Sequence, residues 1–75
     1  MAVTKTQYRH IHFMEVPQKK GDPKMYEIFN NKSGASLGGV FWYSAWRRFC
    51  IAPESGSVFD ETCLADIIHF IGQLK

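Results

Sequence analysis

Apolar and polar residues alternate along most of the chain, which is the period of a half-buried β-strand. The alternation predicts four strands, at residues 7–16, 25–31, 37–43 and 47–52. The segments between them, PQKKGDPK, NKSGAS and SAW, are short and contain turn-forming residues, so each predicts a chain reversal. Gly38 and Gly39 interrupt the third strand and predict a bulge or a close approach of two backbones.

The period changes near the C-terminus, in DETCLADIIHFIGQLK. Its apolar residues recur at the spacing of one helical face, and we expect that face to be buried. These residues are Leu64, Ile67, Ile68, Ile71 and Leu74. Asp60 is a candidate N-cap, and Glu61 places a negative charge at the positive end of the helix dipole.

Four strands and one helix predict an α+β fold, in which a four-stranded antiparallel meander sheet packs against one C-terminal helix. We expect one domain over residues 1–75, with residues 1–6 as a flexible tail. A helix of about 14 residues is roughly 21 Å long and can cover one face of such a sheet. The other face must then meet solvent, a second copy or a partner.

Alternation divides the strand residues between these two faces. The helix side is expected to hold Ile11, Phe13, Ile28, Val40, Trp42, Phe49 and Ile51. The open side is expected to hold Tyr8, Tyr26, Phe41, Tyr43 and Arg48. Trp46 lies in the turn between the last two strands, where it either caps the edge of the core or stands out as an anchor.

The composition is that of an ordinary globular domain, with 45% hydrophobic and 21% charged residues, and it excludes a disordered chain. The net charge of +2 is too small to indicate a nucleic-acid-binding protein by itself. Basic residues nevertheless gather in the first predicted hairpin loop, at Lys19, Lys20 and Lys24, and beside the tryptophans, at Arg47 and Arg48. A polarised surface is therefore expected.

Two cysteines, Cys50 and Cys63, are too few for a disulfide framework, and we expect both to be small apolar core residues. The N-terminus lacks the pattern of a signal peptide, and no apolar run reaches the roughly 20 residues that cross a bilayer. The expected location is the cytoplasm, with no membrane partner.

The sequence offers little chemistry for catalysis. His10 and His12 are spaced to share one strand face, but no third metal ligand accompanies them. Cys63 and His69 point to different faces of the predicted helix, and no phosphate-binding glycine loop is present. We therefore expect a protein that is not an enzyme, with no catalytic residues, metal or cofactor.

The segment GGVFWYSAWRRFC combines aromatic side chains and arginines, the residue types that dominate binding hot spots. The predicted partner-binding residues are Tyr8, Phe41, Tyr43, Trp46, Arg47 and Arg48. We expect Arg47 to pack along the ring of Trp42 or Trp46, and Arg48 to face solvent. The alternative is that these rings only complete a small core.

The C-terminal half carries a specific order of residues: a Leu-Gly pair, an aliphatic residue, Trp-Tyr, Trp-Arg, an aromatic residue, a proline and a helix opening near Cys-Leu. In this chain the positions are Leu37, Gly38, Val40, Trp42, Tyr43, Trp46, Arg47, Phe49, Pro53, Cys63, Leu64, Asp66 and Ile67. This order resembles a family of small uncharacterised proteins of bacteriophages and prophages. The resemblance implies a phage-related origin and no particular mechanism.

Together these patterns predict a non-enzymatic phage-type binding module whose aromatic and arginine-bearing sheet face binds a host or phage protein in the host cytoplasm, including as an inhibitor of host machinery. The alternative is a nucleic-acid-binding domain that uses the same rings as a stacking platform. A homodimer is a further possibility, because self-association competes for an uncovered aromatic face.

Overall fold

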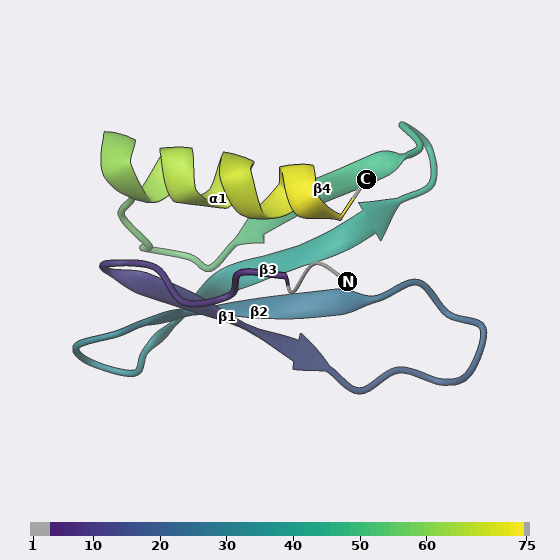
Figure 1. The fold of residues 1–75 in the computed structure, drawn as a ribbon, viewed down its shortest axis with the longest axis horizontal. Helices are drawn as coiled ribbons and strands as arrows, with labels where there is room; N and C mark the ends of the chain where they lie inside the picture. The colour runs from purple at the N-terminus through teal and green to yellow at the C-terminus, as the bar shows by residue number, and fades with distance from the viewer. Residues whose placement is uncertain (1–3, 75) are drawn as a thin grey trace.

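The computed structural model describes residues 4–74 and contains the predicted architecture. The strands are β1 (Ile11–Val16), β2 (Met25–Asn30), β3 (Ser36–Tyr43) and β4 (Arg48–Pro53), followed by α1 (Glu61–Gln73). The sheet has the order β1-β2-β3-β4 and each neighbouring pair is antiparallel. Figure 1 shows α1 lying along one face of this sheet, so the expected α+β meander with one C-terminal helix is confirmed.

The first strand is shorter than the alternation predicts, because the chain turns sharply before Ile11. Tyr8 N donates to Ile11 O at 2.9 Å, and Gln7 forms an isolated bridge with His12. Phe13 N donates to Thr6 O, also at 2.9 Å. The segment before β1 therefore folds back along the outer edge of that strand.

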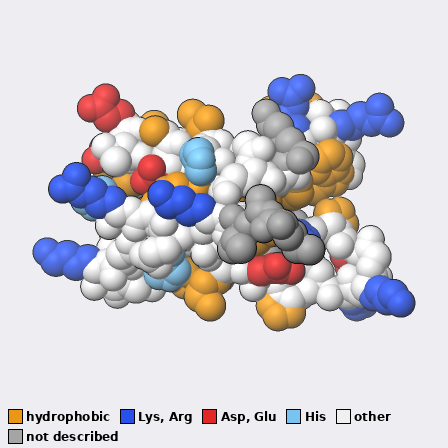
Figure 2. Space-filling model, viewed as in Figure 1, with side chains coloured by type: hydrophobic (Ala, Val, Ile, Leu, Met, Phe, Trp, Pro, Cys, Tyr) orange, Lys and Arg blue, Asp and Glu red, His pale blue; other side chains and the backbone are white. Residues whose placement is uncertain are grey.

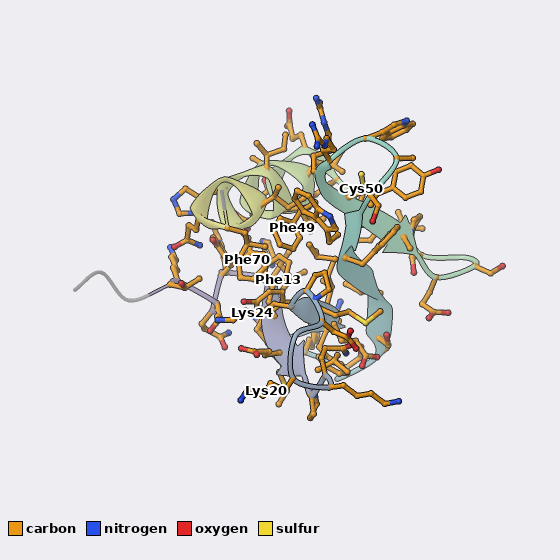
Figure 3. The ribbon with its side chains drawn as sticks, turned by 90° about the vertical axis from the view of Figure 1, so that its right-hand side faces the viewer. Phe13, Lys20, Lys24, Phe49, Cys50 and Phe70 are labelled. Carbon is orange, nitrogen blue, oxygen red and sulfur yellow. The ribbon has the colours of Figure 1, made fainter. Side chains whose placement is uncertain are left out.

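The core lies between α1 and the inner face of the sheet. Its most buried side chains are Tyr8, Ile11, Phe13, Tyr26, Ile28, Val40, Ile67 and Phe70. The ring of Phe70 stacks on Phe13 with centroids 3.9 Å apart and meets Tyr26 edge-on at 4.9 Å. Phe13 and Phe70 can be followed in Figure 3, where both lie between helix and sheet. One aromatic residue of the helix thus fixes α1 against β1 and β2.

Two tyrosines expected on the open side belong to this core. Tyr8 is 8% exposed and Tyr26 6% exposed, so both of those predictions are wrong. Tyr26 shares the inner face with Ile28, two residues along β2, because successive side chains of a strand alternate. Tyr8 reaches the core because the chain reversal before β1 places it beneath α1, where its Oη is hydrogen-bonded to His69 Nδ1 at 2.7 Å.

The helix begins as predicted, and its buried face contains Ile67, Ile71 and Leu74 of the predicted five residues but not the other two. Asp60 is the N-cap, and its carboxylate accepts a hydrogen bond of 2.8 Å from Cys63 N. Leu64 and Ile68, expected to be buried, are 48% and 72% exposed. The residues that meet the core are Cys63, Ile67, Phe70, Ile71 and Leu74. The predicted face was based on the aliphatic residues alone and left out Phe70. The ring of Phe70 fills the centre of the interface between the helix and the sheet.

Gly38 confirms the predicted close approach of backbones. Its φ is +148°, and a Cβ at this position would lie 2.6 Å from Ala52 O on β4. One residue earlier, Leu37 is the extra residue of a register shift between β2 and β3. The two features let β3 bend while it remains paired on both sides.

The predicted flexible tail covers residues 1–6, of which residues 1–3 lie outside the described residues. Lys5 is instead held against the end of α1. Its N–H donates to Gln73 Oε1 at 2.8 Å, and its carbonyl accepts from Gln73 Nε2 at 2.9 Å. Its ammonium group lies 4.7 Å from the centre of the Tyr8 ring.

Candidate protein-binding surface

The face of the sheet opposite α1 is here called the open face. The strand registers assign its side chains to four rows, one for each strand. They are His12, Met14 and Val16; Met25, Glu27 and Phe29; Phe41 and Tyr43; and Arg48, Cys50 and Ala52. Figure 3 shows the division on β4, where Phe49 points toward the helix and Cys50 lies on the other side.

Aromatic rings continue from the open face into the turn between β3 and β4. The rings of Phe41 and Tyr43 lie 6.1 Å apart, and those of Tyr43 and Trp46 lie 5.0 Å apart, both edge to face. Tyr43 is 40% exposed and Trp46 64% exposed. Trp46 is therefore exposed and does not cap the edge of the core.

The turn itself is fixed by backbone geometry. Trp46 N donates to Tyr43 O and Arg47 N donates to Ser44 O, both at 3.2 Å. Arg47 has a φ of 53°, in the left-handed region that costs a side-chain-bearing residue energy. Arg48 follows, and its Nε donates to Trp46 O at 3.3 Å. These contacts fix the backbone on both sides of the exposed tryptophan, which the two arginines follow in the chain.

The expected packing of Arg47 along a tryptophan ring is not what orders this turn. Arg47 is exposed, and the one cation–π contact among residues 4–74 is that of Lys5 with Tyr8. The left-handed backbone of Arg47 directs the chain from the turn into β4. Arg48 is exposed at the start of that strand, as expected.

Five of the six predicted partner-binding residues come together in this way: Phe41, Tyr43, Trp46, Arg47 and Arg48. Tyr8 does not join them, because its ring is buried on the other side of the sheet against Phe13 and His69. Burial also raises the pKa of the Tyr8 hydroxyl, and the negative charge of Asp66 adds to that shift. Tyr8 is accordingly a core residue.

The open face also carries apolar side chains that were not assigned to a site from the sequence. Met14 is 57% exposed and Met25 38% exposed, and Phe29 stacks on His12 with centroids 5.4 Å apart. Methionines adapt their shape to a partner, which suits a binding surface. The alternation of β1 and β2 already placed Met14 opposite Ile11 and Phe13, so the signal was present.

A hollow of about 590 Å³ adjoins the turn on the helix side of the sheet. It is lined by Trp42, Arg47, Arg48, Phe49, Ile71 and Leu74. Trp42 does point to the helix side and meets Phe49 edge-on at 5.3 Å, but it remains 37% exposed beside the end of α1. Figure 2 shows hydrophobic side chains gathered at this end of the molecule, next to Lys and Arg side chains.

His10 and His12 were considered as metal ligands from the sequence. His10 precedes β1, and His12 Nδ1 donates a 2.6 Å hydrogen bond to Asn31 Oδ1. Within residues 4–74, no three His, Cys, Asp or Glu residues are grouped so that they could hold a metal ion.

The two cysteines have different surroundings, although the sequence suggested one role for both. Cys63 packs against the core, and its burial raises the pKa of the thiol. Cys50 is half-buried on the open face and is therefore not a core residue.

Comparisons with protein-family models, curated proteins and solved structures gave no match. Within residues 4–74, no helix combines the length and the apolar character needed to span a membrane.

Proposed function

We propose that this chain is a non-enzymatic binding module that grips a partner protein with the open face and the turn between β3 and β4. The observation that carries the proposal is the continuous row of Phe41, Tyr43 and Trp46, flanked by Arg47 and Arg48, on a face that α1 leaves uncovered. Trp, Tyr and Arg are the residues most enriched at hot spots of protein interfaces.

The structure of the turn supports this role. Trp46 is the most exposed aromatic residue among the large hydrophobic side chains, yet its backbone is fixed by hydrogen bonds on both sides. A rigid aromatic anchor loses little conformational entropy when it enters a partner's pocket. The turn is therefore prepared for binding in the free protein.

A protein partner suits this surface better than nucleic acid. The open face carries Glu27 and the apolar side chains of Met14 and Met25 beside its rings, and the net charge of the chain is only +2. Binding to phosphates needs a concentration of positive charge, whereas an interface between proteins needs apolar area with few charges at its centre.

The resemblance of the C-terminal half to small phage proteins extends the proposal to biological context. In that context the partner is a host or phage protein in the host cytoplasm, and binding inhibits the host machinery to which the partner belongs. Trp42, Tyr43, Trp46 and Arg47 are both part of the resemblance and close to the proposed surface.

The test is a pulldown from host lysate with the wild-type protein, the double variant Tyr43→Ala/Arg48→Ala and the control Val58→Ala. Val58 is 86% exposed and belongs to the loop before α1, away from the turn between β3 and β4. We expect the same partner to be retained by wild type and Val58→Ala, and to bind the double variant about tenfold more weakly or worse. Equal retention by the double variant would contradict the proposed surface.

Nuclease treatment and salt separate the two classes of partner. A protein interface should survive nuclease, and its affinity should change little between about 50 mM and 200 mM salt. Loss of the captured material on nuclease treatment, or a steep fall in affinity with salt, would assign the surface to nucleic acid instead.

A further inference from the structure

The two edges of the sheet differ in how they are protected. Along β1, the segment containing Thr6 and Gln7 folds back over the outer edge and pairs with His12 and Phe13. Along β4, no backbone hydrogen bond from residues 4–74 reaches the outer side of the strand. An uncovered edge of six residues is a template for pairing with another strand.

The hydrogen-bond register between β3 and β4 identifies which backbone N–H and C=O groups of β4 are not bonded to β3. Glu54 N donates to Leu37 O at 3.0 Å, which makes Leu37 and Glu54 a hydrogen-bonded pair in the ladder with β3. Because such pairs alternate along an antiparallel ladder, Ala52, Cys50 and Arg48 are bonded to β3 in the same way. Phe49 and Ile51 therefore direct their N–H and C=O groups outward, and Pro53 directs its C=O outward.

The ends of this edge carry opposite charges. Arg48 begins β4, and Glu54 follows its last residue. Both side chains are exposed, and strand alternation places both on the same side as Cys50 and Ala52, the open face. Two antiparallel copies of this edge place each arginine beside the other copy's glutamate, so the edge is complementary to itself.

We propose that a second copy of this chain docks on β4, so that two β4 strands pair antiparallel about a two-fold axis at Ile51. In this register Ile51 faces Ile51 of the partner subunit and forms a hydrogen-bonded pair with it. Phe49 N donates to the C=O of Pro53 of the partner subunit. All four outward N–H groups are used, whereas the C=O of Phe49 in each copy is left without a donor, because proline has no N–H. Arg48 lies opposite Glu54 of the partner subunit, and Glu54 opposite Arg48 of the partner subunit.

The apolar hollow beside β4 favours the same arrangement. Phe49 and Ile51 are only half-buried within one chain, because the aromatic contacts of α1 are with β1 and β2. A second β4 alongside covers the flank of both side chains. The two sheets become one eight-stranded sheet, with the two open faces side by side on one surface. Pairing thus leaves Tyr43 and Trp46 free, and Arg48 is the residue that the dimer shares with the surface proposed for a partner protein.

The charge pattern gives a direct test by sedimentation velocity over a concentration series. We expect the wild-type protein to dimerise, and Arg48→Glu or Glu54→Arg to raise the dimer dissociation constant about tenfold or more, since each change creates two like-charge pairs. The double variant Arg48→Glu/Glu54→Arg restores both pairs and should return the constant to near the wild-type value. A wild-type protein that stays monomeric, or single variants that dimerise as well as wild type, would overturn the proposal.

Hydrogen exchange locates the interface. The amides of Phe49 and Ile51 should become protected as the protein concentration rises, whereas that of Ala52, already bonded to β3, should be unaffected. Concentration-independent exchange at Phe49 and Ile51 in a dimeric sample would place the dimer on another surface and overturn the pairing. Circular dichroism checks that the variants remain folded, and if a reversal unfolds the chain, Arg48→Gln and Glu54→Gln provide the same comparison.

Discussion

Ile67 and Ile68 are adjacent on α1 but lie in opposite environments. Ile67 is 3% exposed, whereas Ile68 is 72% exposed. Ile67→Ala should lower the free energy of unfolding by about 2–5 kcal/mol, because it leaves a cavity under the helix. Ile68→Ala should change it by less than about 0.5 kcal/mol. Equilibrium unfolding in urea measures both values, and equal losses would contradict the helix orientation.

Gly38 and Gly72 should respond to alanine with opposite signs. At Gly38 the added Cβ meets Ala52 O and the backbone has a positive φ, so Gly38→Ala should destabilise the fold by about 1–3 kcal/mol or more. At Gly72 the Cβ meets nothing within 4 Å, and alanine should stabilise the helix by roughly 0.5–1 kcal/mol. Thermal melts of the two variants beside wild type test the pair. A Gly38→Ala protein as stable as wild type would show that the β3–β4 approach is looser than described.

At the scale of the element, the start of α1 depends on the charge of Asp60. The hydrogen bond from Cys63 N is the main cause that lowers the pKa of the Asp60 carboxyl. A lowered pKa in the folded state means that this stabilisation is present above the unfolded value and is lost as the pH falls through the folded value. Wild type should therefore lose stability relative to Asp60→Asn as the pH drops from about 5 to about 2, since asparagine caps without titrating. Parallel pH profiles of the melting temperature would contradict this assignment.

The type and order of the elements could be predicted because each depends on local chemistry. Strand alternation, turn residues and the Asp60 cap all act within a few positions, and the structure confirms the four strands, their turns and the helix start. The buried face of α1 was predicted only in part, since Ile67, Ile71 and Leu74 meet the core but Leu64 and Ile68 do not. Its orientation depends on Phe70 entering the space between Phe13 and Tyr26, two residues that are distant in sequence.

At the scale of the whole molecule, the meander brings separate loops to one end. The loop between β1 and β2, with Lys20 and Lys24, lies at the same end as the β3–β4 turn and the C-terminal end of α1 (Figure 1). An antiparallel meander has this consequence for every second connection. The basic loop and the aromatic turn can therefore meet one partner, although 20 or more positions separate Lys24 from Trp46 in the chain.

The sequence by itself determined the fold class, the helix cap and most of the aromatic surface, because periodicity and turn chemistry are read from neighbouring residues. Only the tertiary structure decided that Tyr8 is a core residue, that Trp46 is exposed and that one sheet edge is covered while the other is free. These outcomes depend on how the segment before β1 folds back and on where the helix ends over the sheet. Both are set by packing between distant residues, which no local pattern specifies.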